Sequence, residues 1–153
     1  MARKPQISLL ETHLGYWLRM VSNHVSHAFS RKVAAADVTV AEWVVLRTLY
    51  PADGATPSRV ADELKMTRGA ISKLVDRLVA KDLVSRTVSK GDRRWQDVAL
   101  TPKGRALVPR LAALADDNDA EFFGALSPQE RATLERILRK IVRQREIESV
   151  PVD

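Results

Sequence analysis

The sequence of 153 residues predicts a mainly α-helical fold with one small β-hairpin, on three observations. Helix-start signals punctuate the chain: a Ser or Thr precedes a proline, or stands three residues before a glutamate. Apolar residues between these signals recur at helical spacing. Between residues 83 and 100, two strand-like runs flank a Gly-Asp pair, which is typical of a hairpin tip.

The first two predicted helices carry long apolar stripes. The first covers residues 7–35, and its stripe consists of Leu10, Leu14, Trp17, Val21, Val25 and Phe29. The second covers residues 40–50 and begins at the capping box formed by Thr39 and Glu42. We expect it to bury Trp43, Leu46 and Leu49.

The next two predicted helices have the spacing of a helix–turn–helix. After a turn at residues 51–54, a short helix at 57–64 starts at Thr56-Pro57 and buries Val60, Ala61 and Leu64. A break of a few residues precedes a helix at 67–80, capped by Thr67. This fourth helix separates its faces: the inward set is Ile71, Leu74, Val75 and Leu78, and the outward set is Arg68, Gly69, Ser72, Lys73 and Asp76.

Two strands and two further helices complete the expected fold. The strands cover residues 83–89 and 95–100, and their tip, residues 90–94, is cationic at three of five positions. A fifth helix at 102–123 should kink at Pro109, because proline lacks an amide hydrogen. A sixth, at 128–147, starts at a capping box of Ser127 and Glu130, and its stripe is Leu134, Ile137, Leu138 and Ile141.

These elements predict a winged helix-turn-helix with long flanking helices, in a single domain over residues 1–153. Residues 39–100 suffice for the winged lobe. The helices at 7–35 and 102–147 carry more apolar surface than so small a lobe can cover, so we expect them to pack against a second copy of the chain.

Composition restricts the possible partners and compartments. The net charge of +6 and the sequence pI of about 10.0 favour a polyanion, either nucleic acid or an acidic membrane surface. A dimer would carry twice +6, or +12. The absence of cysteine excludes disulfides and thiolate metal sites. We see no membrane-spanning apolar run and no signal-type core after residue 6, so we expect a cytoplasmic protein.

The outward face of the fourth helix suits the major groove of DNA. Arg68, Ser72 and Lys73 have the reach to contact base edges, and Gly69 would allow the backbone to come close. Arg77 suits a phosphate. Ser58 and Thr67, near the starts of the third and fourth helices, complete the contacts expected there. The alternative is an ordinary solvated helix face, but the basic hairpin that follows favours DNA.

The hairpin tip suits the minor groove. Lys90, Arg93 and Arg94 concentrate positive charge, and Arg94 is the residue that we expect to enter a narrow groove. Asp92 would be repelled by DNA, so its role is indirect. It either orients a neighbouring arginine through a charge-assisted hydrogen bond or favours the turn, and both can hold together.

Three segments resemble the MarR family of bacterial transcription regulators: Thr39–Leu46, Leu74–Leu78 followed by Lys81–Val84, and Asp92-x-Arg94 followed after five residues by Leu100-Thr101. The resemblance covers essentially the whole chain. It implies a triangular homodimer whose two winged lobes bind a palindromic operator in double-stranded DNA, usually for repression that a small ligand releases. One departure is Asp82, where the family commonly has glycine, and we expect it to alter a helix end without altering function.

The family resemblance also implies an effector pocket between the flanking helices and the winged lobe. The residue types there suit a small aromatic carboxylate or phenolic ligand: His13, Tyr16 and Trp17 on the first helix, with Trp43 and Arg47 on the second. The alternative is that both tryptophans are core residues and that the histidines pack at a dimer seam.

Other functions find less support in the sequence. His24 and His27 lie one helical turn apart but have no evident third ligand, so we predict no metal site and no cofactor. No nucleophile–base pair or phosphate-binding glycine loop indicates an enzyme. A membrane-surface helix does not fit so many capped helices. The remaining alternative is a winged helix used as a protein-interaction module, which would require an apolar outer face on the fourth helix.

Overall fold

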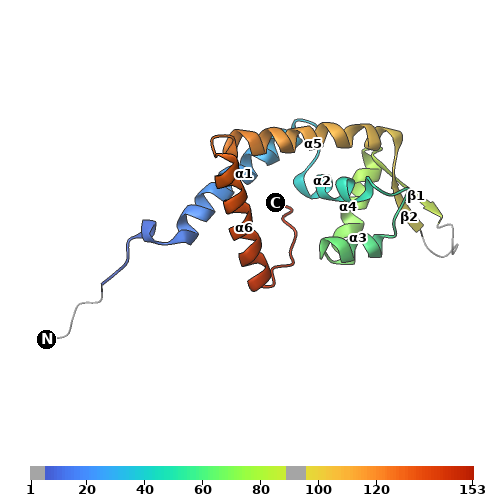
Figure 1. Ribbon diagram of the computed structural model, residues 1–153. Coiled ribbons are helices and arrows are strands. Elements are labelled where there is room, and N and C mark those ends of the chain that lie inside the picture. The colour runs from blue at the N-terminus through green and yellow to red at the C-terminus, as the bar shows by residue number, and fades with distance from the viewer. Residues whose placement is uncertain (1–5, 89–95) are drawn as a thin grey trace.

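The computed structural model describes residues 6–88 and 96–153 and confirms the mainly helical fold with one hairpin (Figure 1). In chain order the elements are a 3-10 turn η1 (Leu10–Thr12), α1 (Leu14–Ala34), α2 (Val40–Leu49), α3 (Pro57–Leu64), α4 (Arg68–Ala80), β1 (Val84–Val88), β2 (Gln96–Leu100), α5 (Pro102–Phe123) and α6 (Pro128–Gln144).

A compact lobe and extended flanking helices divide the molecule (Figure 1). Helices α2, α3 and α4 and the hairpin form the winged lobe beneath one end of α5. The C-terminal part of α1 runs beside the other end of α5. The N-terminal part of α1 projects away from the lobe, and α6 runs down from the far end of α5, on the side of the lobe away from the hairpin (Figure 1). Among the described helices, each is too short or too polar to span a bilayer.

Side-chain caps define five helix starts, as predicted. Thr39 and Ser127 form full capping boxes with Glu42 and Glu130, respectively. The hydroxyls of Thr56, Thr67 and Thr101 each accept a hydrogen bond from the backbone amide three residues later. Each such cap contributes about 1 kcal/mol, so these polar residues determine where the helices begin.

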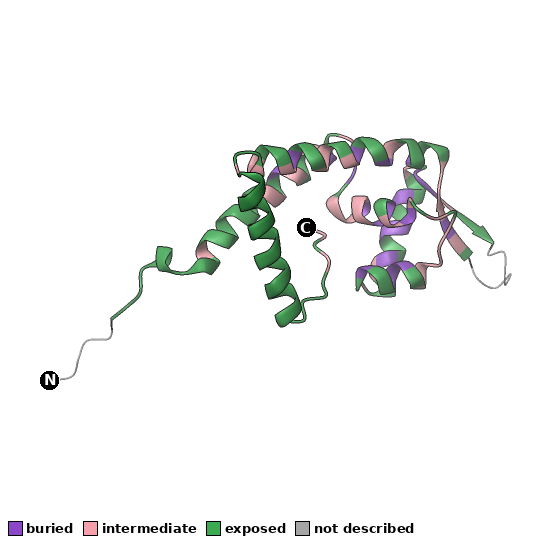
Figure 2. Cartoon of the chain, in the orientation of Figure 1, coloured by how far each residue is buried: buried purple, intermediate pink, exposed green. Residues whose placement is uncertain are grey.

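Burial is concentrated in the winged lobe and the part of α5 above it (Figure 2). Leu46, Ile71, Leu78 and Leu111 are completely buried there, together with valines from α1 through α5 and from both strands. The predicted inward faces of α3 and α4 are confirmed residue by residue. Trp43 is only half-buried, however, and Glu42 and Val45 are the buried residues of α2 beside Leu46 and Leu49.

The hairpin is antiparallel, with Val84 opposite Leu100 and Val88 opposite Gln96. The bend after α2 holds it to the lobe, because Ala55 and Val98 exchange two backbone hydrogen bonds of 3.0 and 2.8 Å. The connection between the paired ends, residues 89–95, lies outside the described residues.

The first helix is shorter than predicted. We expected it to begin near Ile7, but α1 begins at Leu14, because His13 is extended. The Thr12 hydroxyl donates to the Leu9 carbonyl at 2.6 Å, and the Trp17 indole N–H donates to the Glu11 carbonyl at 2.9 Å. These local bonds compete with the helical ladder.

The predicted stripe of α1 is apolar but uncovered over its first half. Leu14 is 87% exposed and Trp17 is 50% exposed, so the alternative that Trp17 is a core residue does not hold within one chain. Val25 and Phe29, further along, are half-buried against α5.

α5 runs from Pro102 to Phe123 with Pro109 inside it, and the kink predicted at this proline stays a prediction. The end of the last helix needs correction. α6 ends at Gln144 instead of Ile147, because Glu146 adopts a left-handed conformation with φ of 51°. Every residue of the α6 stripe is exposed.

Candidate nucleic-acid interface

The turn between α3 and α4 sets the angle of the candidate recognition helix. Lys65 ends α3 in a left-handed conformation, and the Met66 amide donates to the Ala61 carbonyl at 3.0 Å. This pattern closes the helix in the manner of a Schellman motif. Thr67 then caps α4, whose inward face is locked in the core.

The outward face of α4 is polar and uncovered. Arg68, Gly69, Ser72, Lys73 and Arg77 are all exposed, and Ser58 at the start of α3 is half-buried. Within residues 6–88 and 96–153, Arg68, Lys73 and Arg77 form no ion pair. Among the large apolar side chains of α4, which the structure describes in full, only Val79 is exposed, at 37%. Such a face fits a polyanion better than a protein partner.

Gly69 leaves the first turn of α4 without a side chain at this position of the outward face. A Cβ atom built there meets no atom of the described residues within 4 Å, so packing does not require glycine. An absent side chain allows the helix backbone to come closer to a surface docked against it.

An ion pair that we did not predict joins α4 to the wing. Arg86 of β1 donates a hydrogen bond to the carboxylate of Asp76 on α4. The pair is largely exposed and contributes about 0–1 kcal/mol to stability. Its effect is geometric and electrostatic: it neutralises the negative charge of Asp76, which would otherwise repel DNA, and sets the hairpin against the helix.

A second unpredicted pair holds the C-terminal end of α4. The Glu42 carboxylate is 1% exposed and accepts a hydrogen bond of 2.9 Å from Lys81, which also donates to the Asp37 carbonyl. Buried charges require such partners. Glu42 stood out in the sequence as a capping residue, but its contact with Lys81, 39 positions away, has no local signal.

The departure from the family pattern at Asp82 has a defined structure. Asp82 has φ of 57°, and the Leu83 amide donates to the Leu78 carbonyl at 2.9 Å. Asp82 therefore ends the helix in the conformation that glycine adopts more easily. The end of α4 therefore has a Schellman closure with aspartate at the left-handed position, so the altered helix end that we expected is not seen. That the change leaves function unaltered stays a prediction.

The wing-tip predictions remain untested. Lys90, Asp92, Arg93 and Arg94 lie outside the described residues. The strands β1 and β2 on either side of them project from the side of the lobe away from α6, and β1 contacts α4 (Figure 1).

The predicted ligand residues, all of which the structure describes, are not brought together within one chain. His13, Tyr16 and Trp17 lie at the start of α1, where the two aromatic rings meet edge to face at 5.3 Å. The ring nitrogen Nδ1 of His13 lies 3.1 Å from the Leu9 carbonyl oxygen. Arg47 is exposed on α2. Of these five residues, Trp43 lines a cavity between the flanking helices and the lobe.

That cavity, which we call the Trp43 cavity, has a volume of about 350 Å³. Its walls come from α1, α2, α5 and the segment that follows α6, and they are Val25, Ser26, Phe29, Val40, Trp43, Val44, Ala115, Asn118, Asp119, Val150, Pro151 and Asp153. Within the described part of the chain, these walls include two carboxylates and no Lys, Arg or His. They therefore lack the cation that we expected Arg47 to supply for an aromatic carboxylate.

Polar residues close the α1–α5 side of this cavity. Asn118 is buried, donates to the Val25 carbonyl at 3.2 Å and accepts from Lys32 at 3.0 Å. Lys32 also pairs with Glu121 at 2.6 Å. This network satisfies the amide and holds α1 against α5.

The histidine pair shows no metal-binding arrangement among the described residues. His24 and His27 line a shallow groove with Arg31 and Glu121 on the α1–α5 surface. Nδ1 of His24 lies 2.8 Å from the Met20 carbonyl oxygen. Over the part of the chain that the structure describes, no three metal-ligating side chains of the His, Cys, Asp or Glu type gather in one place.

The fold and this polar helix face define the class of a winged helix-turn-helix protein, and comparisons identify the family. The model of the MarR family matches residues 36–94. The multiple antibiotic resistance protein MarR of Escherichia coli strain K12 is 31% identical over 130 residues, which span 84% of this chain and 90% of that protein. The chain belongs to the MarR family, which confirms the resemblance that its three motifs carry.

Solved structures agree with this assignment. An E. coli MarR variant in complex with operator DNA is similar with a TM-score of 0.74 and 31% identity, over 84% of this chain and 93% of that one. Bordetella bronchiseptica BpsR, whose DNA binding is regulated by 6-hydroxynicotinic acid, has a TM-score of 0.75 and 27% identity, over 89% of this chain and 97% of that one.

Proposed function

We propose that this protein is a transcription regulator that binds double-stranded DNA through α4 and the wing. The observation that carries the proposal is the outward face of α4, where three cations and one serine are exposed beside a glycine. The complex of the similar E. coli MarR variant with operator DNA supports it. Arg68, Ser72 and Lys73 contact base edges, Arg77 contacts a phosphate, and Arg94 enters the minor groove.

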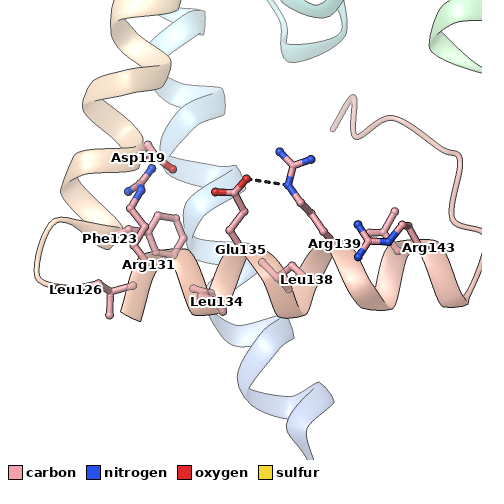
Figure 3. A pocket seen from close by; sticks show the side chains of 10 residues that line it. Asp119, Phe123, Leu126, Arg131, Leu134, Glu135, Leu138, Arg139 and Arg143 are labelled. Carbon is pink, nitrogen blue, oxygen red and sulfur yellow. Dashed lines mark hydrogen bonds and ion pairs between the residues drawn. The ribbon is translucent and has the colours of Figure 1, made fainter. Parts of the chain in front are cut away.

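We propose further that the active form is a homodimer on a palindromic operator. The uncovered apolar surface of the flanking helices supports this. Phe123, Leu126, Leu134, Leu138 and Val142 line a groove of about 580 Å³ between α5 and α6 (Figure 3). Ion pairs edge it, including Arg131 with Asp119, and the hydrogen bond to Asp119 and its charge raise the pKa of the Arg131 guanidinium. A helix of a second copy would fill such a groove.

Regulation completes the proposal: the protein is a repressor that a small aromatic or phenolic ligand releases from DNA. The Trp43 cavity supports this, because apolar walls from α1, α2 and α5 meet in it. The regulator of BpsR, 6-hydroxynicotinic acid, is an aromatic acid. The Asp153 carboxylate, in described walls that hold no Lys, Arg or His, favours a neutral phenol over an acid in this chain. Phenol and benzoate distinguish the two kinds of ligand. The one that binds should raise the melting temperature of the protein and release it from DNA.

The central test of DNA binding starts with a duplex selected by the protein from a random pool. Replacing Lys73 with Ala should weaken binding to the selected duplex by about 1–3 kcal/mol and weaken binding to random DNA much less. Lys140→Ala on α6 removes the same charge away from the winged lobe and is the matched control. Equal losses on both duplexes would make Lys73 a phosphate contact.

The wing and the electrostatic contribution have their own test. Arg94→Ala should weaken binding to the selected duplex, and rising salt should weaken the unaltered protein steeply, because counterions released from phosphates drive association. Failure to select any duplex, together with salt-independent binding, would favour the alternative of a winged-helix module for protein interaction.

A further inference from the structure

The chain reverses direction after α6 and returns to the winged lobe. The Ile147 amide donates to the Val142 carbonyl at 3.0 Å, and Glu146 between them is left-handed with φ of 51°. This closure turns the chain sharply. Residues 148–153, which we call the strap, then run back beside α6 toward α2 (Figure 1).

The strap is better packed than the helix before it. Every residue from 131 to 149 is exposed, whereas Val150 and Val152 are half-buried. Val150 packs against the core of the lobe, and Val150, Pro151 and Asp153 form one wall of the Trp43 cavity. Val152 is not among the described residues that pack against this core or line this cavity.

Two features favour the docked position of the strap on the winged lobe. The Glu148 carboxylate lies 3.8 Å from the Lys65 ammonium, at the end of α3, which places an ion pair between the strap and the helix–turn–helix. Pro151 fixes its own φ and biases Val150 toward an extended conformation. The strap therefore loses less conformational entropy when it docks than a free chain would.

We propose that the strap is a built-in lid of the Trp43 cavity, and that a ligand entering the cavity displaces Val150. The other walls belong to α1, α2 and α5, which the core holds in place. The strap has no helix or strand of its own, and it is held by its contacts at the cavity wall and by the exposed Lys65–Glu148 ion pair. Because the strap joins α6 to α2 and α3, its displacement would also release a tie between the flanking helices and the winged lobe. This last consequence depends on the proposed function, but closure of the cavity does not.

Tryptophan fluorescence tests the closure directly. In a background with Trp17→Phe and Trp95→Phe, Trp43 is the remaining tryptophan of the three in the chain. Val150→Ser should raise acrylamide quenching of Trp43. Serine packs less well than valine against the apolar lobe, so the strap should cover Trp43 less of the time. Val152→Ser, which makes the same change two residues further on, should leave quenching unaltered.

Probe binding tests competition. The probe is 2-naphthol, a neutral bicyclic phenol, titrated by calorimetry into each variant. Val150→Ser should bind it about fivefold more tightly than the unaltered protein, because displacing a half-buried valine no longer costs about 1 kcal/mol. A chain ending at Ile147 should show the same gain. Val152→Ser should not.

The outcomes separate this inference from the proposed function. Equal quenching and equal 2-naphthol affinity in Val150→Ser and Val152→Ser, with DNA binding intact, would overturn the lid alone. A gain of about fivefold in 2-naphthol affinity in a protein that selects no DNA would overturn the proposed function and leave the lid standing.

Discussion

The winged lobe and the flanking helices use their apolar residues in opposite ways. In the lobe, Ile71 and Leu78 are completely buried by other parts of the same chain. On α6, Ile137 and Ile141 are 42% and 44% exposed, although the apolar stripe of α6 has the same i, i+3, i+4, i+7 spacing as the inward face of α4. The same pattern thus produces a closed core where several elements converge and an open face where one helix stands alone. The lobe has what it needs to fold, and the flanking helices require a partner surface.

The largest expected effect tests this requirement. Ile141→Asp should raise the dissociation constant of the proposed dimer about 1,000-fold, because a symmetric interface contains the residue twice and each loss is worth about 2 kcal/mol. Sedimentation velocity over a concentration series measures it. Lys140→Asp, next to the stripe, should have a much smaller effect. An unchanged mass for Ile141→Asp would mean that α6 is not the interface.

The second effect tests the closed core of the lobe. Leu78→Ala should lower the free energy of unfolding by about 3 kcal/mol, because a completely buried leucine leaves a cavity. Val79→Ala, one residue along and 37% exposed, should cost less than about 1 kcal/mol. Urea unfolding at fixed protein concentration measures both. Similar losses would show that the two faces of α4 do not differ as described.

The third effect compares a glycine of α5 that packs against the winged lobe with a glycine on the uncovered part of α1. A Cβ at Gly104 would lie 2.0 Å from the Leu83 carbonyl oxygen, so Gly104→Ala should force α5 away from the wing and cost about 2 kcal/mol. At Gly15 of α1, no atom of the described residues lies within 4 Å of such a Cβ, and Gly15→Ala should stabilise by about 0.5–1 kcal/mol. Thermal unfolding should therefore give a lower melting temperature for Gly104→Ala and a higher one for Gly15→Ala than for the unaltered protein. A tolerated Gly104→Ala would contradict the close approach.

The smallest effect lies at the junction of α4 with the wing. Asp82→Gly should raise stability by about 1 kcal/mol, because glycine adopts φ of 57° without a Cβ clash. Asp62→Gly, at a regular helical position in α3, should lower stability by a few tenths of a kcal/mol. A loss of stability in Asp82→Gly would show that the aspartate side chain has a role beyond the turn.

Local chemistry made most of the fold predictable. The caps at Thr39, Thr56 and Thr101 depend on residues within three positions, so the sequence shows them directly. The inward face of α4 follows from a helical period of about 3.6 residues. The outward cations follow from the same period, which is why the candidate DNA-binding face appears in the sequence as clearly as the core beneath it.

Side-chain contacts that fall outside the helical repeat were not predictable in the same way. The start of α1 was placed too early, because the bond from Trp17 to the Glu11 carbonyl competes with the helix that the stripe favours. The pairs Asp76–Arg86 and Glu42–Lys81 join residues 10 and 39 positions apart. Charged residues are frequent on helix surfaces, so neither pair distinguishes itself until the elements are packed.

The capped helix starts, the order of the elements and the polarity of α4 were set by interactions within a few residues, and the order of the amino acids alone therefore revealed them. The Trp43 cavity is different, because its walls come from residues as far apart as Val25 and Asp153. Their meeting depends on where α6 ends and how sharply Glu146 turns the chain. Apolar residues attract any apolar surface equally, and three-dimensional packing selected which of them enclose this space.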